Sequence, residues 1–149
     1  MIALIQRVSR ASVTIEDQLT ARIDAGMLAL IGVQRPDTHE SVSQLAEKLL
    51  GYRLFEDGQG KMNLDIRESG GQLLLVPQFT LAADTHKGRR PGFSSAASPE
   101  QASELFDALV DIVSREPLTV ARGTFGANMQ VALINDGPVT FWLETRRPE

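Results

Sequence analysis

The chain has 149 residues, carries a formal net charge of −4 and contains no cysteine. Its length suits a single domain over residues 1–149, and its 42% of apolar and 23% of charged residues exclude a disordered or collagen-like chain. The lack of cysteine excludes disulfides, thiolate catalysis and cysteine zinc sites. The longest apolar stretches, 27–33 and 73–76, are too short for a signal peptide or a membrane span, so we expect a cytoplasmic protein.

The first part of the chain predicts strands followed by a helix. β-branched residues and a rough alternation of apolar positions predict a strand over 2–15 and a short segment near 19–23. The continuous apolar run 27–33 is typical of a strand that is covered on both faces. Thr38 has the chemistry of a helix cap, and apolar residues at helical spacing then predict a helix over 39–51.

The middle of the chain contains one strand and one helix between two loops. Residues 56–72 are rich in Gly, Asp, Asn and Gln, which predicts a loop with room for a short hairpin. A second apolar strand is predicted over 72–81, but Pro77 removes a ladder hydrogen bond, so the strand should bulge or end there. After the small, basic loop 82–97, a Ser-Pro-x-Gln helix start predicts a helix over 98–115.

Three strands are predicted at the end of the chain, over 119–123, 129–134 and 139–144. The order of elements predicts an α/β fold, with largely antiparallel sheets in a barrel-like or two-layer arrangement and two main helices packed on one side. The segment 135–138, Asn-Asp-Gly-Pro, separates the last two strands and has two interpretations. It is a hairpin turn, for which Asp-Gly is common, or it holds a cis Gly-Pro peptide.

The residue types of most hydrolytic sites are missing. The two histidines, His39 and His86, lie far apart without metal-ligand spacing, so we expect both to be solvated and no metal to be bound. The chain has neither the glycine-rich phosphate-binding motifs nor a Gly-x-Ser-x-Gly motif.

The segment 77–81, Pro-Gln-Phe-Thr-Leu, is a candidate site because it ends an apolar strand. A strand end that turns into a loop can expose backbone N–H groups, and these would form an oxyanion hole beside the Gln78 amide and the Thr80 hydroxyl. The alternative interpretation is an edge strand with an incidental polar pair.

A cluster of cations follows this segment. Lys87, Arg89 and Arg90 lie in one loop of an acidic protein, which favours an anionic ligand such as phosphate, although a solvated loop explains the same residues. Since the chain as a whole is acidic, any contact with RNA should be small and sensitive to salt.

Taken together, seven segments resemble the D-aminoacyl-tRNA deacylases of the common bacterial and eukaryotic type. The resemblance runs along the whole chain, in order, over residues 1–8, 60–64, 78–81, 90–91, 123–125, 129–131 and 135–140. It implies a homodimer with active sites at the subunit interface, which hydrolyses the ester of a D-amino acid, or of mischarged glycine, at the 3′ end of tRNA. It implies no metal, cofactor, membrane or DNA.

The resemblance also implies roles for particular residues. Gln78, Phe79 and Thr80 match the segment that lines the ester carbonyl. Gly137-Pro138 matches a cis dipeptide that reaches into the pocket of the partner subunit, where its carbonyls leave no room for the side chain of an L-amino acid. Further substrate contacts are expected from Phe125, Met129 and Pro77.

Position 77 departs from the resemblance, because the family usually has serine there. Proline has neither the hydroxyl nor the backbone N–H of serine. This difference supports one alternative function, a non-catalytic tRNA-binding module of the same fold.

Two mechanisms are compatible with this site. In one, Thr80 is a nucleophile, although no side chain is an obvious base for it. In the other, which we prefer, the 2′-hydroxyl of the tRNA assists water and the N–H groups near Phe79 and Thr80 hold the oxyanion. The second mechanism explains why no histidine or carboxylate is found there.

Overall fold

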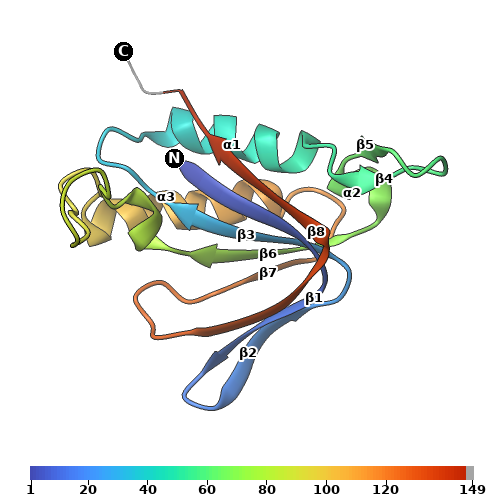
Figure 1. Cartoon of the computed structure of the whole chain (residues 1–149), viewed down its shortest axis with the longest axis horizontal. Coiled ribbons are helices and arrows are strands. Elements are labelled where there is room, and N and C mark those ends of the chain that lie inside the picture. Colours follow the sequence, from blue (N-terminus) through green and yellow to red (C-terminus); the bar gives the residue numbers. More distant parts are fainter. Residues whose placement is uncertain (147–149) are drawn as a thin grey trace.

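A computed structural model describes residues 1–146, and its sheet is built around one long strand (Figure 1). Strand β1 (Ile2–Ile15) pairs antiparallel with three others. Along one edge its first half pairs with β3 (Gly26–Gly32) and its second half with β2 (Gln18–Ile23). Its other edge pairs with β8 (Gln130–Glu144) over nearly its full length. The sheet therefore turns a corner within β1 and curls into a nearly closed barrel.

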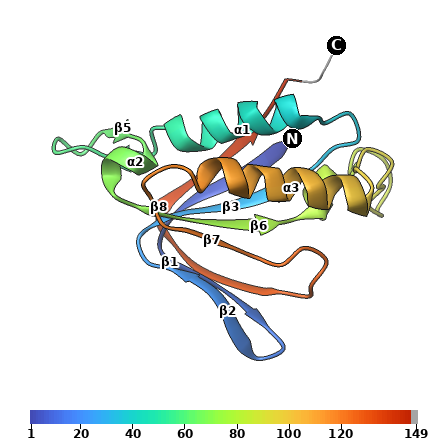
Figure 2. The same ribbon diagram turned by 180° about the vertical axis from the view of Figure 1, so that it is seen from behind.

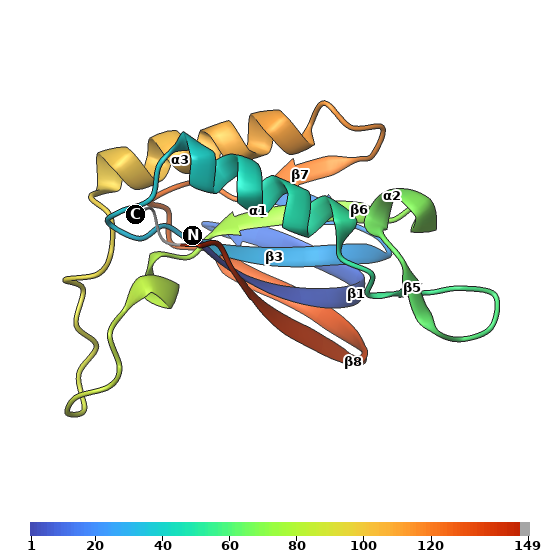
Figure 3. The ribbon, with the colours of Figure 1, turned by 90° about the horizontal axis from the view of Figure 1, so that it is seen from above.

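Two parallel pairs extend this sheet. Strand β3 pairs in parallel with β6 (Gln72–Pro77), and β6 pairs in parallel with β7 (Val120–Arg122). Parallel neighbours need a crossover connection, and here these contain α1 (His39–Gly51) and α3 (Pro99–Val113). Both helices lie side by side over one face of the sheet (Figures 2 and 3). The predicted α/β architecture, with mostly antiparallel pairing and two main helices on one side, is confirmed.

Apolar residues are buried on both faces of the sheet. One cluster fills the space between the helices and the sheet, with contributions at helical spacing from α1 and α3. A second, smaller cluster fills the inside of the barrel, with Leu28 from β3 and Leu74 and Val76 from β6 among its members. Because β3 and β6 are covered on both sides, their sequences are continuous apolar runs rather than alternating ones.

One sequence-based expectation is confirmed and two are corrected. Strand β6 ends at Pro77, one of the two outcomes that the proline predicted, and a 3-10 helix, η1 (Phe79–Ala82), follows it. The segments 129–134 and 139–144 are one strand, β8, so residues 135–138 do not form a hairpin turn. They are accommodated by two shifts in the register between β8 and β1, and the chain continues in the same direction.

The second correction concerns residues 56–72. The expected short hairpin is present as β4 (Phe55–Glu56) and β5 (Met62–Leu64), but a short helix, α2 (Ile66–Ser69), follows it. The sequence carried a signal for this helix. The Asp65 side chain accepts from the Glu68 N–H, and the Glu68 side chain accepts from the Asp65 N–H, which is a capping box.

No helix within residues 1–146 is long and apolar enough to cross a membrane.

A buried cluster of polar groups joins the residue before β1 and the residue after β8 to the connection before α1. The Met1 ammonium donates to Asp37 Oδ1 at 2.7 Å and to Thr145 Oγ1 at 2.6 Å, and all three residues are buried. The other Asp37 oxygen accepts from the Gln34 N–H at 2.6 Å. Each polar group therefore has a partner, which is the condition for burying charge without a large loss of stability.

We predict that Asp37→Ala lowers the free energy of unfolding by about 3–5 kcal/mol, because it leaves the buried ammonium without a counter-charge. Denaturant unfolding measures this loss. Asp24→Ala is the control, because Asp24 pairs with Arg22 at 3.1 Å on the exposed surface, and its removal should cost under about 1 kcal/mol. Equal losses in the two variants would contradict the prediction.

Candidate active site

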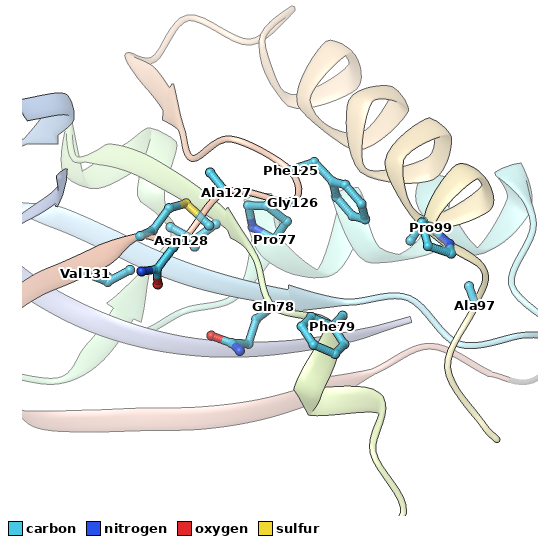
Figure 4. Close-up of a pocket in the computed structure, with 13 residues that line it drawn as sticks. Pro77, Gln78, Phe79, Ala97, Pro99, Phe125, Gly126, Ala127, Asn128 and Val131 are labelled. Atoms are coloured by element: carbon cyan, nitrogen blue, oxygen red, sulfur yellow. The ribbon is translucent and has the colours of Figure 1, made fainter. Parts of the chain in front are cut away.

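A cavity of about 470 Å³ opens at the carboxyl end of β6 (Figure 4). The structure brings five of the predicted site residues to its wall, namely Pro77, Gln78, Phe79, Phe125 and Met129. Much of the remaining wall is small or apolar and comes from the start of α3 and from β8, where Ala97, Pro99, Ala102 and Val131 lie. Sequence reasoning missed these four residues, because small apolar side chains carry no chemical signal of a site.

The end of β6 fixes the direction of the catalytic candidates. The Gln78 N–H donates to the Ile31 carbonyl of β3 at 2.7 Å, and this is the last hydrogen bond in line with the β3–β6 ladder. The chain then turns into η1, where the Leu81 N–H donates back to the Gln78 carbonyl at 3.2 Å. Gln78 is therefore held by its backbone on both sides while its side chain stays at the mouth of the cavity (Figure 4).

Two backbone donors are left over at this turn. The first N–H groups of a helix have no acceptor within the helix, and in η1 these belong to Phe79 and Thr80. Neither N–H has an acceptor elsewhere among residues 1–146. Two neighbouring donors without partners, beside a cavity, have the chemistry needed to hold a developing oxyanion.

Thr80 does not line the cavity itself but lies next to it. Its hydroxyl accepts a hydrogen bond from the Gln78 side-chain amide, which is not a base. In the part of the chain that the structure describes, no carboxylate or imidazole lines the cavity or bonds to Thr80. The two histidines are elsewhere and exposed, as expected, with His39 near Glu104 and His86 near Asp84.

Phe79, which lines the cavity, forms an aromatic pair with Phe93. Phe79 is 60% exposed and Phe93 is 42% exposed, and their ring centroids are 5.5 Å apart. The two rings therefore form a small exposed aromatic surface next to the cavity.

The cationic loop begins directly beyond η1 and projects from the body of the molecule (Figure 3). Its base is closed by Asp84 and Gly92, whose backbones exchange hydrogen bonds of 2.7 and 3.0 Å. The His86 backbone N–H, together with its ring, lowers the pKa of Asp84 below its usual value. Lys87, Arg89 and Arg90 are all exposed in this loop.

The Gly137-Pro138 peptide is cis, as the resemblance to the deacylases implies, and it lies at the exposed bend of β8. Two side chains that sequence reasoning did not single out hold this bend. Arg7 Nε donates to the Asp136 carbonyl at 3.0 Å. Asn135 Oδ1 accepts from the Val139 N–H at 2.7 Å, across the bend.

This bend is remote from the cavity of the same chain. Arg7, next to the bend on β1, pairs with Met27 at the start of β3, whereas Pro77 pairs with Ile31 near its end. Four residues of strand span about 13 Å. Accordingly, neither Gly137 nor Pro138 lines the cavity.

Comparisons with known proteins confirm the resemblance. A family model described as D-Tyr-tRNA(Tyr) deacylase matches residues 4–144. Proteins named D-aminoacyl-tRNA deacylase from Enterobacter sp. (strain 638) and Escherichia coli (strain K12 / DH10B) are each 53% identical over 144 residues. Those alignments cover 97% of this chain and 99% of each relative.

Two solved structures have the same fold. One, titled "c-Myc DNA Unwinding Element Binding Protein", has a TM-score of 0.94 at 36% identity and covers 98% of this chain and 99% of its own. The other, titled "Structural Analysis of a probable eukaryotic D-amino acid tRNA deacylase", has a TM-score of 0.82 at 18% identity, covers 97% and 98%, and shows the fold alone. From the family model and the two close relatives it follows that this chain belongs to the D-Tyr-tRNA(Tyr) deacylase family.

Proposed function

We propose that this chain hydrolyses the ester of D-aminoacyl-tRNA, and of mischarged glycyl-tRNA, and leaves L-aminoacyl-tRNA intact. The observation that carries the proposal is the site at the end of β6. It offers two unpartnered N–H groups beside a largely apolar cavity and, within the described residues, no base and no metal-ligating cluster. Such a site suits a substrate that is already activated, and the 53% identical relatives named D-aminoacyl-tRNA deacylase support the assignment.

The aminoacyl ester supplies most of what the site lacks. It is an activated ester, and the ribose that carries it has a 2′-hydroxyl beside the 3′-oxygen. Water adds to the carbonyl carbon with help from that hydroxyl, while the N–H groups of Phe79 and Thr80 hold the oxyanion. The bond to the 3′-oxygen then breaks, which releases the free amino acid and a tRNA that ends in a 3′-hydroxyl.

Selection against L-amino acids is assigned to Gly137-Pro138, acting on the cavity of the other subunit of a homodimer. The bend is too far from the cavity of its own chain to act there. Exposed apolar side chains on β8 and β2, namely Ile134, Trp142 and Leu19, support an interface on this side of the molecule. Exclusion by backbone carbonyls would reject any L side chain and let glycine pass.

The cationic loop is proposed to contact the phosphates near the 3′ end of the tRNA, through Lys87, Arg89 and Arg90. The loop is exposed and starts directly after η1, whose Phe79 lines the cavity. Aminoacyl-tRNA as the substrate is consistent with action in the cytoplasm.

The function is tested by the hydrolysis of D-tyrosyl-, L-tyrosyl- and glycyl-tRNA. We expect the wild-type chain to cleave the D and glycyl esters and to spare the L ester. Gly137→Ala should reduce the preference for D over L, because Gly137 has φ +140° and a Cβ there would lie 2.6 Å from Val139 Cγ2. Gly58→Ala is the control, because a Cβ at Gly58 meets nothing within 4 Å.

A different result would favour the alternative function. If none of the three esters is cleaved while tRNA is still bound, the chain is a non-catalytic tRNA-binding module, and Pro77 is the residue that separates it from active relatives.

The two mechanisms are separated by a pair of variants at one position. We predict that Thr80→Ala keeps kcat within about threefold, because it removes the hydroxyl and keeps the N–H, whereas loss of a nucleophile would cost several orders of magnitude. Thr80→Pro removes the N–H from the first turn of η1, where proline fits a helix, and should lower kcat about 100-fold. Single-turnover hydrolysis of D-tyrosyl-tRNA gives both values. Loss of activity in Thr80→Ala with tRNA binding retained would support the nucleophile.

The homodimer is tested by mixing two defective chains. Gly137→Ala is expected to be active with a reduced preference for D over L, and Thr80→Pro to keep only about 1% of the wild-type kcat. If each cavity is completed by Gly137-Pro138 of the partner subunit, co-expression with excess Thr80→Pro chain should restore the D over L preference of the Gly137→Ala chain. An unchanged preference in isolated mixed dimers, or a monomeric wild-type chain in sedimentation, would refute the shared site.

A further inference from the structure

Pro77 interrupts the ladder between β6 and β7 at a specific hydrogen bond. In this parallel pair the Leu73 N–H donates to the Thr119 carbonyl at 2.9 Å, and the Gly123 N–H donates to the Leu75 carbonyl at 2.8 Å. A parallel ladder alternates in this way along both strands. The next donor would be the N–H of residue 77, directed at the Gly123 carbonyl, and proline has none.

The surroundings of Gly123 make a missing donor costly. Gly123 is buried. A Cβ placed on it would lie 2.9 Å from Met129 Sδ and 3.3 Å from Pro77 Cδ, so the proline ring packs where the ladder would have continued. A buried carbonyl without a donor loses the hydrogen bonds that water gave it in the unfolded chain.

Arg122 supplies a donor to this carbonyl. Its Nε donates to the Gly123 oxygen at 3.3 Å. The same guanidinium is fixed from α3, since it donates to Asp107 Oδ1 at 2.8 Å and its central carbon lies 5.0 Å from the centroid of the Phe106 ring. A side chain with two such anchors loses little additional freedom when it makes the third contact.

We propose that the Arg122 guanidinium replaces the N–H that Pro77 lacks, and that Arg122 is thereby a positioning residue for the active site. The Gly123 carbonyl begins the loop that carries Phe125 and Met129, and Pro77 directly precedes Gln78. Fixing this carbonyl therefore holds the start of that loop against α3, whose Pro99 and Ala102 line the same cavity. The expected effect of Arg122 on kcat rests on the proposed function, whereas the replacement of one hydrogen-bond donor by another does not.

A double-mutant cycle tests the proposal. The four chains are the wild type, Pro77→Ser, Arg122→Met and the double variant, and kcat and KM are measured on D-tyrosyl-tRNA. In the wild-type background, Arg122→Met should lower kcat about tenfold and leave KM within about twofold, because the site is misplaced rather than its contacts with tRNA lost. In the Pro77→Ser background, where the serine N–H completes the ladder, the same change should lower kcat less than about twofold.

Two further variants separate the Nε contact from the ion pair. Arg122→Lys can still pair with Asp107 but has no Nε, so it should lose activity as Arg122→Met does. Arg67→Met is the matched control, since the Arg67 side chain is also 40% exposed and pairs with carboxylates, Asp65 and Glu116, and its loss should leave kcat unchanged. Equal losses of kcat from Arg122→Met in the wild-type and Pro77→Ser backgrounds, or full activity of Arg122→Lys, would overturn the proposal.

A measurement that does not depend on activity tests the replacement of the donor even if the wild-type chain cleaves no ester. In Pro77→Ser combined with Arg122→Met, hydrogen exchange of the amide introduced at position 77 reports whether this N–H reaches the Gly123 carbonyl. Slow exchange of this amide would support the proposal that the Arg122 guanidinium and an N–H at position 77 are alternative donors to the Gly123 carbonyl. The midpoint of thermal unfolding of the double variant should then be higher than that of Arg122→Met alone and closer to that of the wild type. Exchange as fast as in an exposed loop would overturn it. A failure of the proposed function thus remains distinguishable from a failure of this inference.

Discussion

The hydrogen bond from the Gln78 N–H to the Ile31 carbonyl is the point on which the geometry of the site depends. It is the last bond in line with the β3–β6 ladder, and it fixes where the chain leaves a sheet that is buried on both faces. Because the chain turns immediately into η1, the N–H groups of Phe79 and Thr80 have no backbone acceptor among residues 1–146. The cavity thus obtains its donors from a strand end rather than from side chains.

Donors of this kind explain how an ester could be cleaved without a histidine or a carboxylate. Backbone N–H groups do not titrate near neutral pH, and a rigid sheet holds them in place before the substrate arrives. Little reorganisation is then needed as charge develops on the carbonyl oxygen. The rate of the proposed reaction then depends on where the protein holds the ester relative to these donors. In our proposal, the contacts around Pro77, Gly123 and Arg122 keep the lining of the cavity in place.

The bend of β8 has a different structural origin. Register shifts against β1 let residues 135–138 bulge without reversing the chain, and Arg7 and Asn135 hold the bulge from two sides. This arrangement presents Gly137 and Pro138 on the surface, remote from the cavity of their own chain. In the proposed function, Gly137-Pro138 acts on the cavity of a second copy of the chain, and selectivity and assembly are therefore linked in that proposal.

The sequence by itself determined the α/β class, both main helices with their caps at Thr38 and Ser98, and the stop of β6 at Pro77, because these follow from local spacing and from the missing N–H of proline. It also identified 78–80 and 137–138 as the segments of interest, through their resemblance to a family. Only the tertiary structure decided that 129–144 is one strand, since Asp-Gly favours a turn locally and pairing with β1 overrides it. The ion pair of Arg122 with Asp107 likewise depends on β7 lying against α3, which no local pattern in the sequence records.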